Sequence, residues 1–286
     1  MRFAIVGGDR RSALLAELLL GDGHRVRSFA LEQAALPAEI PRAACLQECV
    51  YGADCVVLPV PAEKSGLLNT PLSAEALPME DVMAALWPGQ LLIGGRLGEQ
   101  RVAAAVRARI GAEDLLRRPS FVVGNAALTA EGAVGLLLRE SERALWGSRV
   151  LLCGFGRIGK LLALRLQAMG AELTVAARGA PDRALAEAFG CEALAFDALE
   201  GRIGDFDFIV NTVPARVLTE PLLCLIRQDA LLLELASPPG GFDRLLAENI
   251  GLHALAAPGL PGKSAPLSAA KLMRQAIYAC IQEQEE

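Results

Sequence analysis

Gly154-Phe155-Gly156-Arg157-Ile158-Gly159 is the stretch of sequence that decides the fold. An apolar run at 149–153 precedes it and predicts a buried strand, and apolar residues at helical spacing follow it. Gly154 suits a tight turn, Gly156 lets the backbone approach a phosphate, and Gly159 lets the helix pack closely on the strand. The strand, turn and helix together predict a site for the pyrophosphate of a dinucleotide at the start of the helix.

The residue that selects between the two nicotinamide dinucleotides is expected at the end of the next strand. That strand, Glu172 to Ala177, is followed by Arg178, and no Asp or Glu stands at its end. A carboxylate there would accept hydrogen bonds from the ribose hydroxyls of NAD, whereas Arg can pair with the 2′-phosphate of NADP. The sequence therefore favours NADP. NAD is the alternative cofactor, and a solvated loop charge is the alternative interpretation of Arg178.

Length and composition are those of a soluble enzyme with two domains. The chain has 286 residues and a net charge of −5, which argues against nucleic acid as a general partner. We find no apolar run near the roughly 20 residues that span a bilayer, and we therefore expect a cytoplasmic protein without membrane association. Most of the seven cysteines lie in apolar segments. They are expected to be reduced core residues, and no metal site is expected.

Strands alternate with helices in two consecutive series, which predicts an α/β fold with two doubly wound parallel sheets. The first series predicts an N-terminal Rossmann-like domain, residues 1–128, for substrate or partner. The second predicts a dinucleotide-binding Rossmann domain, residues 129–286, which opens with a connecting helix from Thr129 to Leu145. The final amphipathic helix, 266–286, is expected to pack back on the first domain. The longest predicted loop, 59–73, follows a strand and is expected to form one wall of a ligand cleft.

The first strand-to-helix turn has only the outline of a dinucleotide site. In Val6-Gly7-Gly8-Asp9-Arg10-Arg11-Ser12, Asp9 and Ser12 stand where the second and third glycines belong. A carboxylate at that point repels pyrophosphate. We therefore expect one cofactor, in the second half of the chain, with Asp9 and Arg11 presented to another ligand. The alternative is a capped helix start, with Asp9 as the N-cap and solvated arginines.

Over nearly its whole length the chain resembles a known family, the A subunits of dipicolinate synthase. The residues that carry the resemblance are spread over both halves and are specific as a combination. They are Ile5-Val6-Gly7-Gly8-Asp9 with Arg11, Leu58-Pro59-Val60, Thr129-Ala130-Glu131-Gly132, the glycine turn at 154–159, Asn211-Thr212-Val213-Pro214, Leu235-Ala236-Ser237 with Pro239-Gly240-Gly241, Ala257-Pro258-Gly259-Leu260-Pro261-Gly262, and Ala265-Pro266. The Rossmann half is similar more broadly to alanine dehydrogenases and 2-hydroxyacid dehydrogenases.

The resemblance implies an oxidoreductase of sporulating bacteria. Such an enzyme oxidises a dihydrodipicolinate, a dicarboxylate, with NADP as the hydride acceptor, and works with a flavoprotein-like B subunit. A homo-oligomer is also expected. Two alternatives stay open: an alanine- or 2-hydroxyacid-type dehydrogenase that acts on another small acid, and a non-catalytic protein that senses NADP.

Further residues of the cofactor site are expected at strand ends of the second domain. Asn211, Thr212 and Pro214 are placed beside the nicotinamide or its ribose by Rossmann topology. The loop from Pro258 to Gly262 is expected to close the nicotinamide end, and its alternative interpretation is a simple turn. The expected cofactor-binding residues are Gly154, Phe155, Gly156, Arg157, Ile158, Gly159, Arg178, Asn211, Thr212, Pro214, Pro258 and Gly259.

A dicarboxylate substrate requires cations, hydroxyls and a group that accepts a proton. Both histidines, at 24 and 253, lie in predicted strands and are interpreted as structural or surface residues. Carboxylates are therefore the candidate bases, although Glu131 can also be an early-turn residue that favours the dipole of its helix. The expected catalytic and substrate-binding residues are Asp9, Arg11, Thr129, Glu131, Ser237 and Lys263. Arg10, Lys64 and Arg96 are weaker candidates, for which surface charge is the default interpretation.

Overall fold

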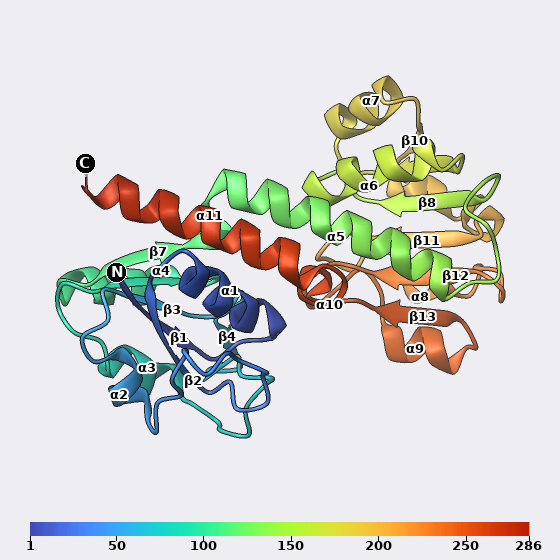
Figure 1. The fold of residues 1–286 in the computed structure, drawn as a ribbon. Coiled ribbons are helices and arrows are strands. Elements are labelled where there is room, and N and C mark those ends of the chain that lie inside the picture. The colour runs from blue at the N-terminus through green and yellow to red at the C-terminus, as the bar shows by residue number, and fades with distance from the viewer. Residues whose placement is uncertain (286) are drawn as a thin grey trace. The chain divides into compact units, whose positions relative to one another are not determined.

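The chain forms two compact units, each with a parallel sheet between layers of helices (Figure 1). The structure is a computed structural model and describes residues 1–285. The first unit comprises Met1–Asn125 together with the C-terminal segment from Ala265, and the second comprises Ala126–Ser264. This arrangement confirms the predicted α/β class with two doubly wound sheets. The boundary expected between residues 128 and 129 falls inside helix α5 (Pro119–Arg139).

The first unit has a parallel five-stranded sheet in the order β2-β1-β3-β6-β7. Its strands are β1 (Arg2–Val6), β2 (Arg25–Phe29), β3 (Cys55–Val57), β6 (Leu91–Gly94) and β7 (Gly111–Asp114). The chain winds outward in opposite directions from β1, whose neighbours are β2 and β3. The crevice of such a sheet therefore opens at the carboxyl ends of β1 and β3. The sequence did not predict β7, because this strand pairs only with β6 at the sheet edge and has little apolar character.

Alternation along the strands builds a hydrophobic layer on each face of the first sheet. In β1, Phe3 and Ile5 face one layer, whereas Ala4 and Val6 face the other. The first layer lies under α1 (Arg10–Gly21) and the C-terminal helix α11 (Pro266–Glu285). The second lies under α2 (Leu46–Val50), α3 (Met79–Ala84) and α4 (Glu99–Arg107). Figure 1 shows α1 and α11 together on one side of this sheet and α2 and α3 on the other.

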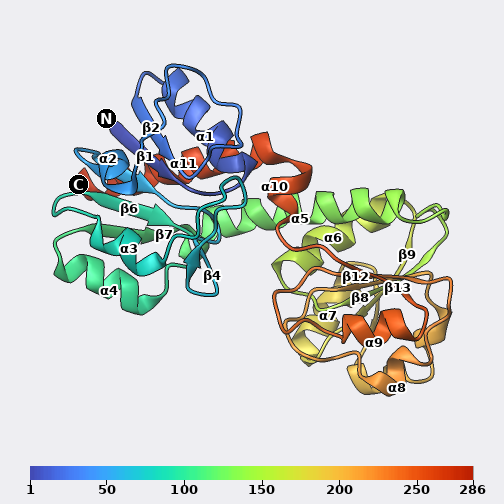
Figure 2. The same ribbon diagram turned by 90° about the horizontal axis from the view of Figure 1, so that it is seen from below.

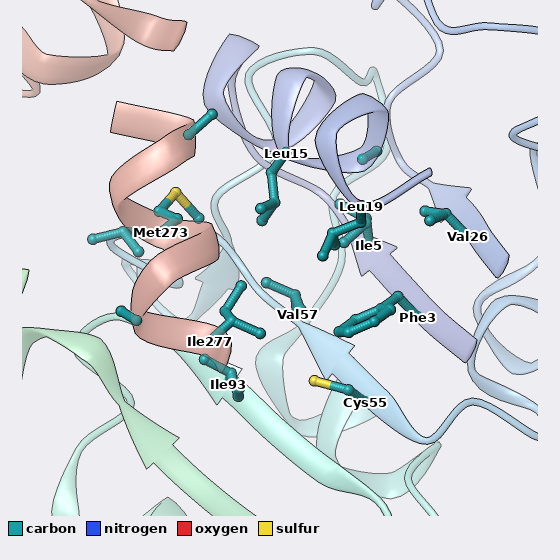
Figure 3. Packing of buried hydrophobic residues seen from close by; sticks show 14 of the residues in the cluster. Phe3, Ile5, Leu15, Leu19, Val26, Cys55, Val57, Ile93, Met273 and Ile277 are labelled. Atoms are coloured by element: carbon teal, nitrogen blue, oxygen red, sulfur yellow. The ribbon is translucent and has the colours of Figure 1, made fainter. Parts of the chain in front are cut away.

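Helix α11 completes the core of the first unit, as predicted. Met273 and Ile277 are buried and point into the layer that holds Leu15 and Leu19 of α1 (Figure 3). Full burial of each large aliphatic side chain contributes roughly 1.5–3 kcal/mol relative to exposure. The last segment of the chain is therefore part of the fold of the first unit, although it follows the second unit in sequence.

The expected loop at 59–73 is shorter than predicted, because a small hairpin occupies its middle. Its strands are β4 (Glu63–Lys64) and β5 (Leu67–Leu68), which pair antiparallel. The hairpin is fixed to the sheet by a hydrogen bond of 2.6 Å from the N–H of Ala62 to the carbonyl of Gly95. The loop residues after β5 reach the turn that follows β1, where the N–H of Gly8 donates to the carbonyl of Asn69.

The second unit has a parallel six-stranded sheet in the order β10-β9-β8-β11-β12-β13. Its strands are β8 (Arg149–Cys153), β9 (Glu172–Ala176), β10 (Glu192–Leu194), β11 (Phe208–Asn211), β12 (Leu231–Glu234) and β13 (His253–Ala256). Its helices after α5 are α6 (Arg157–Ala168), α7 (Ala180–Ala188), α8 (Glu220–Leu223), α9 (Arg244–Asn249) and α10 (Leu260–Ser264). Figure 2 shows α8 and α9 on one side of this sheet and α5 and α6 on the other. Its reversal point lies beside β8, between β9 and β11, and the glycine turn follows this strand.

Helix α5 differs from the expected connecting helix in both position and length. It begins at Pro119, where a proline at the first helical position is tolerated, and ends at Arg139. The predicted span from Thr129 to Leu145 was therefore wrong. With 21 residues, α5 is the one described helix that is long and apolar enough to cross a bilayer by length and composition, which also corrects the expectation that no such run exists. Its Phe121 and Leu137 lie in the hydrophobic cores.

Candidate functional site

The three glycines of the turn after β8 have three different surroundings. A Cβ atom on Gly154, whose φ is +95°, would lie 2.6 Å from Oγ1 of Thr212. A Cβ on Gly159 would lie 2.3 Å from the carbonyl oxygen of Gly154. By contrast, a Cβ on Gly156 would meet no described atom within 4 Å. The turn is therefore closed at its first and third glycines and open at the second, which is where a pyrophosphate must approach the backbone.

The start of α6 provides the electropositive end of the site. Gly156 is the N-cap, and no side chain caps the first turn of the helix. The backbone N–H groups at this end remain available to an anion, and the helix dipole favours negative charge there. Arg157, the first helical residue, is exposed beside them. The arrangement fits a dinucleotide pyrophosphate.

Phe155 does not line the open side of this turn. Its side chain is buried in the core of the second unit and packs edge-to-face on Phe189, with ring centroids 5.6 Å apart. Only its backbone can face a ligand, so Phe155 stays a predicted cofactor-binding residue through its main chain alone. Its physical role is to anchor the turn to the core. Ile158 is half-buried against the same core.

Arg178 lies two residues beyond the carboxyl end of β9, close to where the sequence places it. Its side chain is exposed, and its carbonyl accepts a hydrogen bond of 2.8 Å from Arg183. Arg183 also donates to the carbonyl of Ala177, so it fixes the backbone of this strand end. Among the residues that the structure describes, no carboxylate pairs with the Arg178 guanidinium within 4.0 Å. An exposed guanidinium at this strand end is available to an anion.

Asn211 occupies a different place from the one expected. It is fully buried, and its amide donates to the carbonyl of Val213 at 2.9 Å and to Oε1 of Glu234 at 2.7 Å. Its carbonyl oxygen accepts from the N–H of Val213. Because every polar group of the side chain is engaged inside the fold, Asn211 does not contact the nicotinamide through its side chain. It holds the loop that follows β11.

Glu234, at the end of β12, is the partner that the sequence analysis missed. It is 9% exposed, and its carboxylate also accepts hydrogen bonds from the N–H groups of Ala236 and Gly241. A buried carboxylate is stable only where such donors surround it. The signal in the sequence was an acidic residue that ends the apolar strand Leu231–Glu234. Glu234 therefore organises the segment from Ala236 to Gly241, which contains the candidate residue Ser237.

Two further candidates of the cofactor site lie next to Asn211. The hydroxyl of Thr212 donates to the carbonyl of Cys153 at 2.9 Å, which ties the end of β11 to the glycine turn after β8. Pro214 is exposed. Thr212 and Pro214 therefore lie on the loop at the reversal point of the sheet, where a ligand of this fold binds.

The loop before α10 is arranged at the same edge of the sheet. The N–H of Ala257 donates to the carbonyl of Glu234, Pro258 and Gly259 are exposed, and Gly259 has a φ of +70°. Lys263 is exposed on α10. The helix approaches α5 closely, because a Cβ on Gly132 would lie 2.6 Å from the hydroxyl of Ser264.

Thr129 and Glu131 lie in the middle of α5 and not in its first turn. Thr129 is 7% exposed. Glu131 has an exposed side chain, and its Oε1 lies 3.3 Å from Nη2 of Arg165 on α6. The interpretation of Glu131 as an early-turn residue that favours the helix dipole was therefore wrong. In its place the structure shows a surface ion pair between neighbouring helices.

In the first unit, the turn after β1 is not arranged to bind a pyrophosphate. Its backbone donors are engaged, because Gly7 donates to the carbonyl of Phe29 and Gly8 to that of Asn69. A Cβ on Gly8 would lie 2.0 Å from the hydroxyl oxygen of Ser12, so that side chain fills the space beside the turn. Of the two strand-to-helix turns, the one in the second unit has the open glycine.

Asp9 and Arg11 form an ion pair within this turn. Asp9 is the N-cap of α1 and accepts from the N–H of Arg11 at 2.9 Å. The Arg11 side chain returns to the same carboxylate through Nε and Nη2, and Nη2 also donates to the carbonyl of Val60 at 2.5 Å. Arg11 is only 6% exposed. The N-cap interpretation of Asp9 is confirmed, but the solvated arginine is found only at Arg10, which is exposed.

The hydrogen-bond inventory of Arg11 limits what it can offer a ligand. The single hydrogen on Nε and both hydrogens on Nη2 are used by Asp9 and Val60. Only Nη1 makes no hydrogen bond to the described residues. A bidentate contact with a carboxylate needs two nitrogen atoms with spare hydrogens, so Arg11 can offer a substrate carboxylate Nη1 alone. Contact through Nη1 alone is compatible with the structure.

The histidines and cysteines have structural surroundings. His24 contacts the hydroxyl of Tyr278 at 3.0 Å, and burial lowers its pKa, whereas His253 is exposed at the start of β13. All seven cysteines are free. Burial raises the pKa of the Cys49 thiol to about 12, so that thiol is unreactive at neutral pH. Within residues 1–285, no group of three or more His, Cys, Asp or Glu side chains is placed to hold a metal ion.

Comparison with known families matches each half of the chain to a different description. Residues 2–115 match the N-terminal domain of the dipicolinate synthase A subunit. Residues 137–231 match the NAD-binding domain of D-isomer specific 2-hydroxyacid dehydrogenases. This second match contains the glycine turn and the strand that ends at Arg178. The chain therefore has the nicotinamide-cofactor domain of an oxidoreductase.

A comparison with curated proteins decides the family. The chain is 30% identical to the dipicolinate synthase A subunit of Bacillus subtilis (strain 168) over 234 residues, which is 80% of this chain and 78% of the relative. The chain belongs to the family of dipicolinate synthase A subunits. The resemblance found in the sequence is thereby confirmed.

Solved structures of this family have the same fold. The A chain of dipicolinate synthase from Bacillus subtilis matches with a TM-score of 0.81 and 26% identity, and the match covers 100% of this chain and 98% of the other. The dipicolinate synthase A subunit from Bacillus halodurans matches with a TM-score of 0.83 and 24% identity over 97% and 96%. A transhydrogenase from Sinorhizobium meliloti shares the fold alone, with a TM-score of 0.71 and 15% identity over 99% and 93%.

Proposed function

We propose that this chain is the A subunit of a dipicolinate synthase and oxidises dihydrodipicolinate to dipicolinate with NADP. One observation carries the proposal. In a member of this family, Gly156 leaves an open approach to the uncapped start of α6, as the pyrophosphate of a dinucleotide requires. The cofactor, when bound, would supply a hydride acceptor, and the substrate ring would become aromatic on losing that hydride and a proton.

The proposed preference for NADP rests on Arg178. Its exposed guanidinium follows β9, where an enzyme specific for NAD would present a carboxylate to the ribose hydroxyls. The 2′-phosphate of NADP is a dianion that a guanidinium can pair with. Thr212, Pro214, Pro258 and Gly259 are proposed to border the nicotinamide end of the same cofactor. Asn211 holds the loop that carries Thr212 and Pro214.

The substrate is proposed to meet residues of the remaining candidate set. Arg11 is proposed to contact one carboxylate through Nη1, and Thr129, Ser237 and Lys263 remain proposed substrate-binding residues. Asp9 and Glu131 are the proposed proton acceptors. Both oxygens of Asp9 already accept hydrogen bonds from Arg11, whereas Glu131 uses only Oε1, for its pair with Arg165. Glu131 therefore has the freer carboxylate of the two.

The family also guides the proposed setting of this activity. We propose a dicarboxylate substrate derived from a lysine-pathway intermediate, a partner B subunit, a homo-oligomer, a cytoplasmic location and a role in sporulation. Among the described residues, neither histidine ring hydrogen-bonds to a carboxylate, because His24 contacts Tyr278 and the N-terminal amine and His253 is exposed. This favours the proposed chemistry over a 2-hydroxyacid dehydrogenase, which needs a His and carboxylate pair to take a hydroxyl proton.

The test mixes the purified chain, NADP and the condensation product of pyruvate and aspartate semialdehyde, with and without the B subunit. Growth of the absorbance band of the reduced nicotinamide is expected, together with formation of dipicolinate. Binding of NADP without any hydride exchange, even with the B subunit, would support a non-catalytic sensing role. Oxidation of alanine or a 2-hydroxyacid, with no reaction of the dihydropyridine, would support another dehydrogenase.

A further inference from the structure

Arg96 occupies an unusual position at the carboxyl edge of the first sheet. It follows β6 with an exposed side chain and a φ of +59°, in the left-handed region that favours glycine. Arg109 has nearly the same φ, +58°, but it ends α4, where its N–H donates to the carbonyl of Val106. Left-handed residues commonly end helices. Arg96 ends no helix, so its conformation needs another explanation.

A nearly buried carboxylate holds Arg96 in this conformation. Asp114, at the end of the neighbouring strand β7, accepts hydrogen bonds from the N–H groups of Arg96 at 2.8 Å and Leu97 at 2.9 Å. It also accepts from the N–H of Leu116, and it is 9% exposed. Two charge-assisted hydrogen bonds thus fix the backbone at Arg96 and Leu97, and the third holds Asp114 to the segment that follows β7. The nearly buried Asp114 carboxylate therefore holds the backbone of Arg96 in place at the edge of the sheet.

Arg96 and Arg11 flank the same short segment after β3. The N–H of Gly95 donates to the carbonyl of Pro59 at 3.1 Å, and a Cβ on Gly95 would lie 2.7 Å from Cγ1 of Val60. The carbonyl of that same Val60 accepts from Arg11. The parent strands β1 and β6 both border β3, so they lie two strand spacings apart, roughly 10 Å. A small dicarboxylate fits across such a distance when a guanidinium stands at each side.

We propose that Arg96 is a second carboxylate-binding residue of the substrate site, with Asp114 as the residue that positions it. This inference rests on the proposed function, because it takes the substrate to be a dicarboxylate. Arg11 has only Nη1 to offer, so a substrate with two carboxylates requires a further cation. An exposed guanidinium can take a carboxylate in bidentate fashion. Arg96 therefore distinguishes a dicarboxylate from a monocarboxylate.

The test compares Arg96→Gly with the matched control Arg109→Gly in the full-length chain with NADP present. Glycine relaxes the left-handed backbone at both positions, so neither variant is expected to be less stable than the parent in thermal unfolding. Calorimetry then measures the binding of pyridine-2,6-dicarboxylate and of pyridine-2-carboxylate. Arg96→Gly should weaken dicarboxylate binding roughly ten- to a hundredfold, with much less effect on the monocarboxylate. Arg109→Gly should change neither.

Each contrary result is distinct. Unchanged dicarboxylate binding by Arg96→Gly, with the parent chain binding normally, overturns the role of Arg96 and leaves the proposed function standing. Equal weakening of both ligands overturns its role as the residue for the second carboxylate. A parent chain that binds no pyridine dicarboxylate overturns both proposals. For Asp114→Asn, positioning predicts a raised KM for substrate with kcat retained, whereas a merely structural role predicts a reduced active fraction at unchanged KM.

Discussion

The side-chain amide of Asn211 donates a hydrogen bond of 2.7 Å to the buried carboxylate of Glu234. The same carboxylate accepts hydrogen bonds from the N–H groups of Ala236 and Gly241. The end of β11, the end of β12 and the loop after β12 are therefore all hydrogen-bonded to one carboxylate. A Cβ on Gly241 would lie 2.3 Å from Nδ2 of Asn211, which leaves no room for rearrangement. This pair fixes the loops that border the cofactor site, and neither side chain needs to touch the cofactor.

Asn211→Asp should destabilise the protein in a manner that depends on pH. The change replaces the amide donor with a second carboxylate at hydrogen-bond distance from Glu234, and like charges raise the pKa of one of the two. The folded state then holds a proton that the unfolded state releases above about pH 4, so the stability of the variant falls as pH rises. We expect a loss of about 3 kcal/mol at about pH 8 and less at about pH 5.

Urea unfolding of Asn211→Asp at the two pH values measures this difference. Asn249→Asp, the same substitution at an exposed residue of α9, is the matched control and should change stability by only a few tenths of a kcal/mol. A loss for Asn211→Asp that is the same at both pH values would mean that the two carboxylates do not interact.

Gly156→Val should abolish the binding of NADP with little change in folding stability. The added Cβ meets no described atom within 4 Å, so the substitution should be accommodated by the fold while the side chain stands where the pyrophosphate approaches. Gly154→Val is the contrasting variant. Its Cβ would lie 2.6 Å from Thr212 at a φ of +95°, so it should lower the melting temperature as well. Calorimetric binding of NADP by Gly156→Val within a few-fold of the parent would show that the turn is structural.

Arg178→Asp should shift the preference of the enzyme from NADP towards NAD. The substitution replaces an exposed guanidinium that can pair with the 2′-phosphate by a carboxylate that can accept from ribose hydroxyls. A lost charge-assisted contact corresponds to roughly ten- to a hundredfold in affinity for NADP. The ratio of kcat/KM for the two cofactors is the measurement. If that ratio does not change, Arg178 lies outside the cofactor site.

Arg11→Ala should raise the KM for substrate and also lower the stability of the first unit. The buried guanidinium joins Asp9 to the carbonyl of Val60, and its removal leaves that buried carbonyl without this partner, at a cost of about 1–3 kcal/mol. Affinity for NADP should remain almost intact. Arg10→Ala, an exposed neighbour, should affect neither quantity appreciably. Equal and small effects of both substitutions on KM and unfolding would remove Arg11 from the substrate site.

The glycine turn and its strands were predictable because their causes are local. A buried parallel strand needs a continuous apolar run, and a turn that meets a phosphate needs glycine at fixed spacing, so β8, Gly156 and α6 follow from neighbouring residues. The position of Arg178 follows in the same way from the next strand. By contrast, β7 has a polar sequence and becomes a strand only because β6 offers it an edge to pair with. Such a cause is not visible in a local pattern.

The sequence by itself determined the family, the two doubly wound sheets and the place of the dinucleotide turn, since each depends on periodicity and on residues adjacent in the chain. The tertiary structure decided how the polar side chains are used. In the folded chain Asn211 is buried against Glu234, and Arg11 is bonded to Asp9 and to the carbonyl of Val60. The carboxylate of Asp114 accepts a hydrogen bond from the N–H of Arg96. Hydrogen-bond capacity is finite, so the partners that folding brings together determine which charged groups remain available to a substrate.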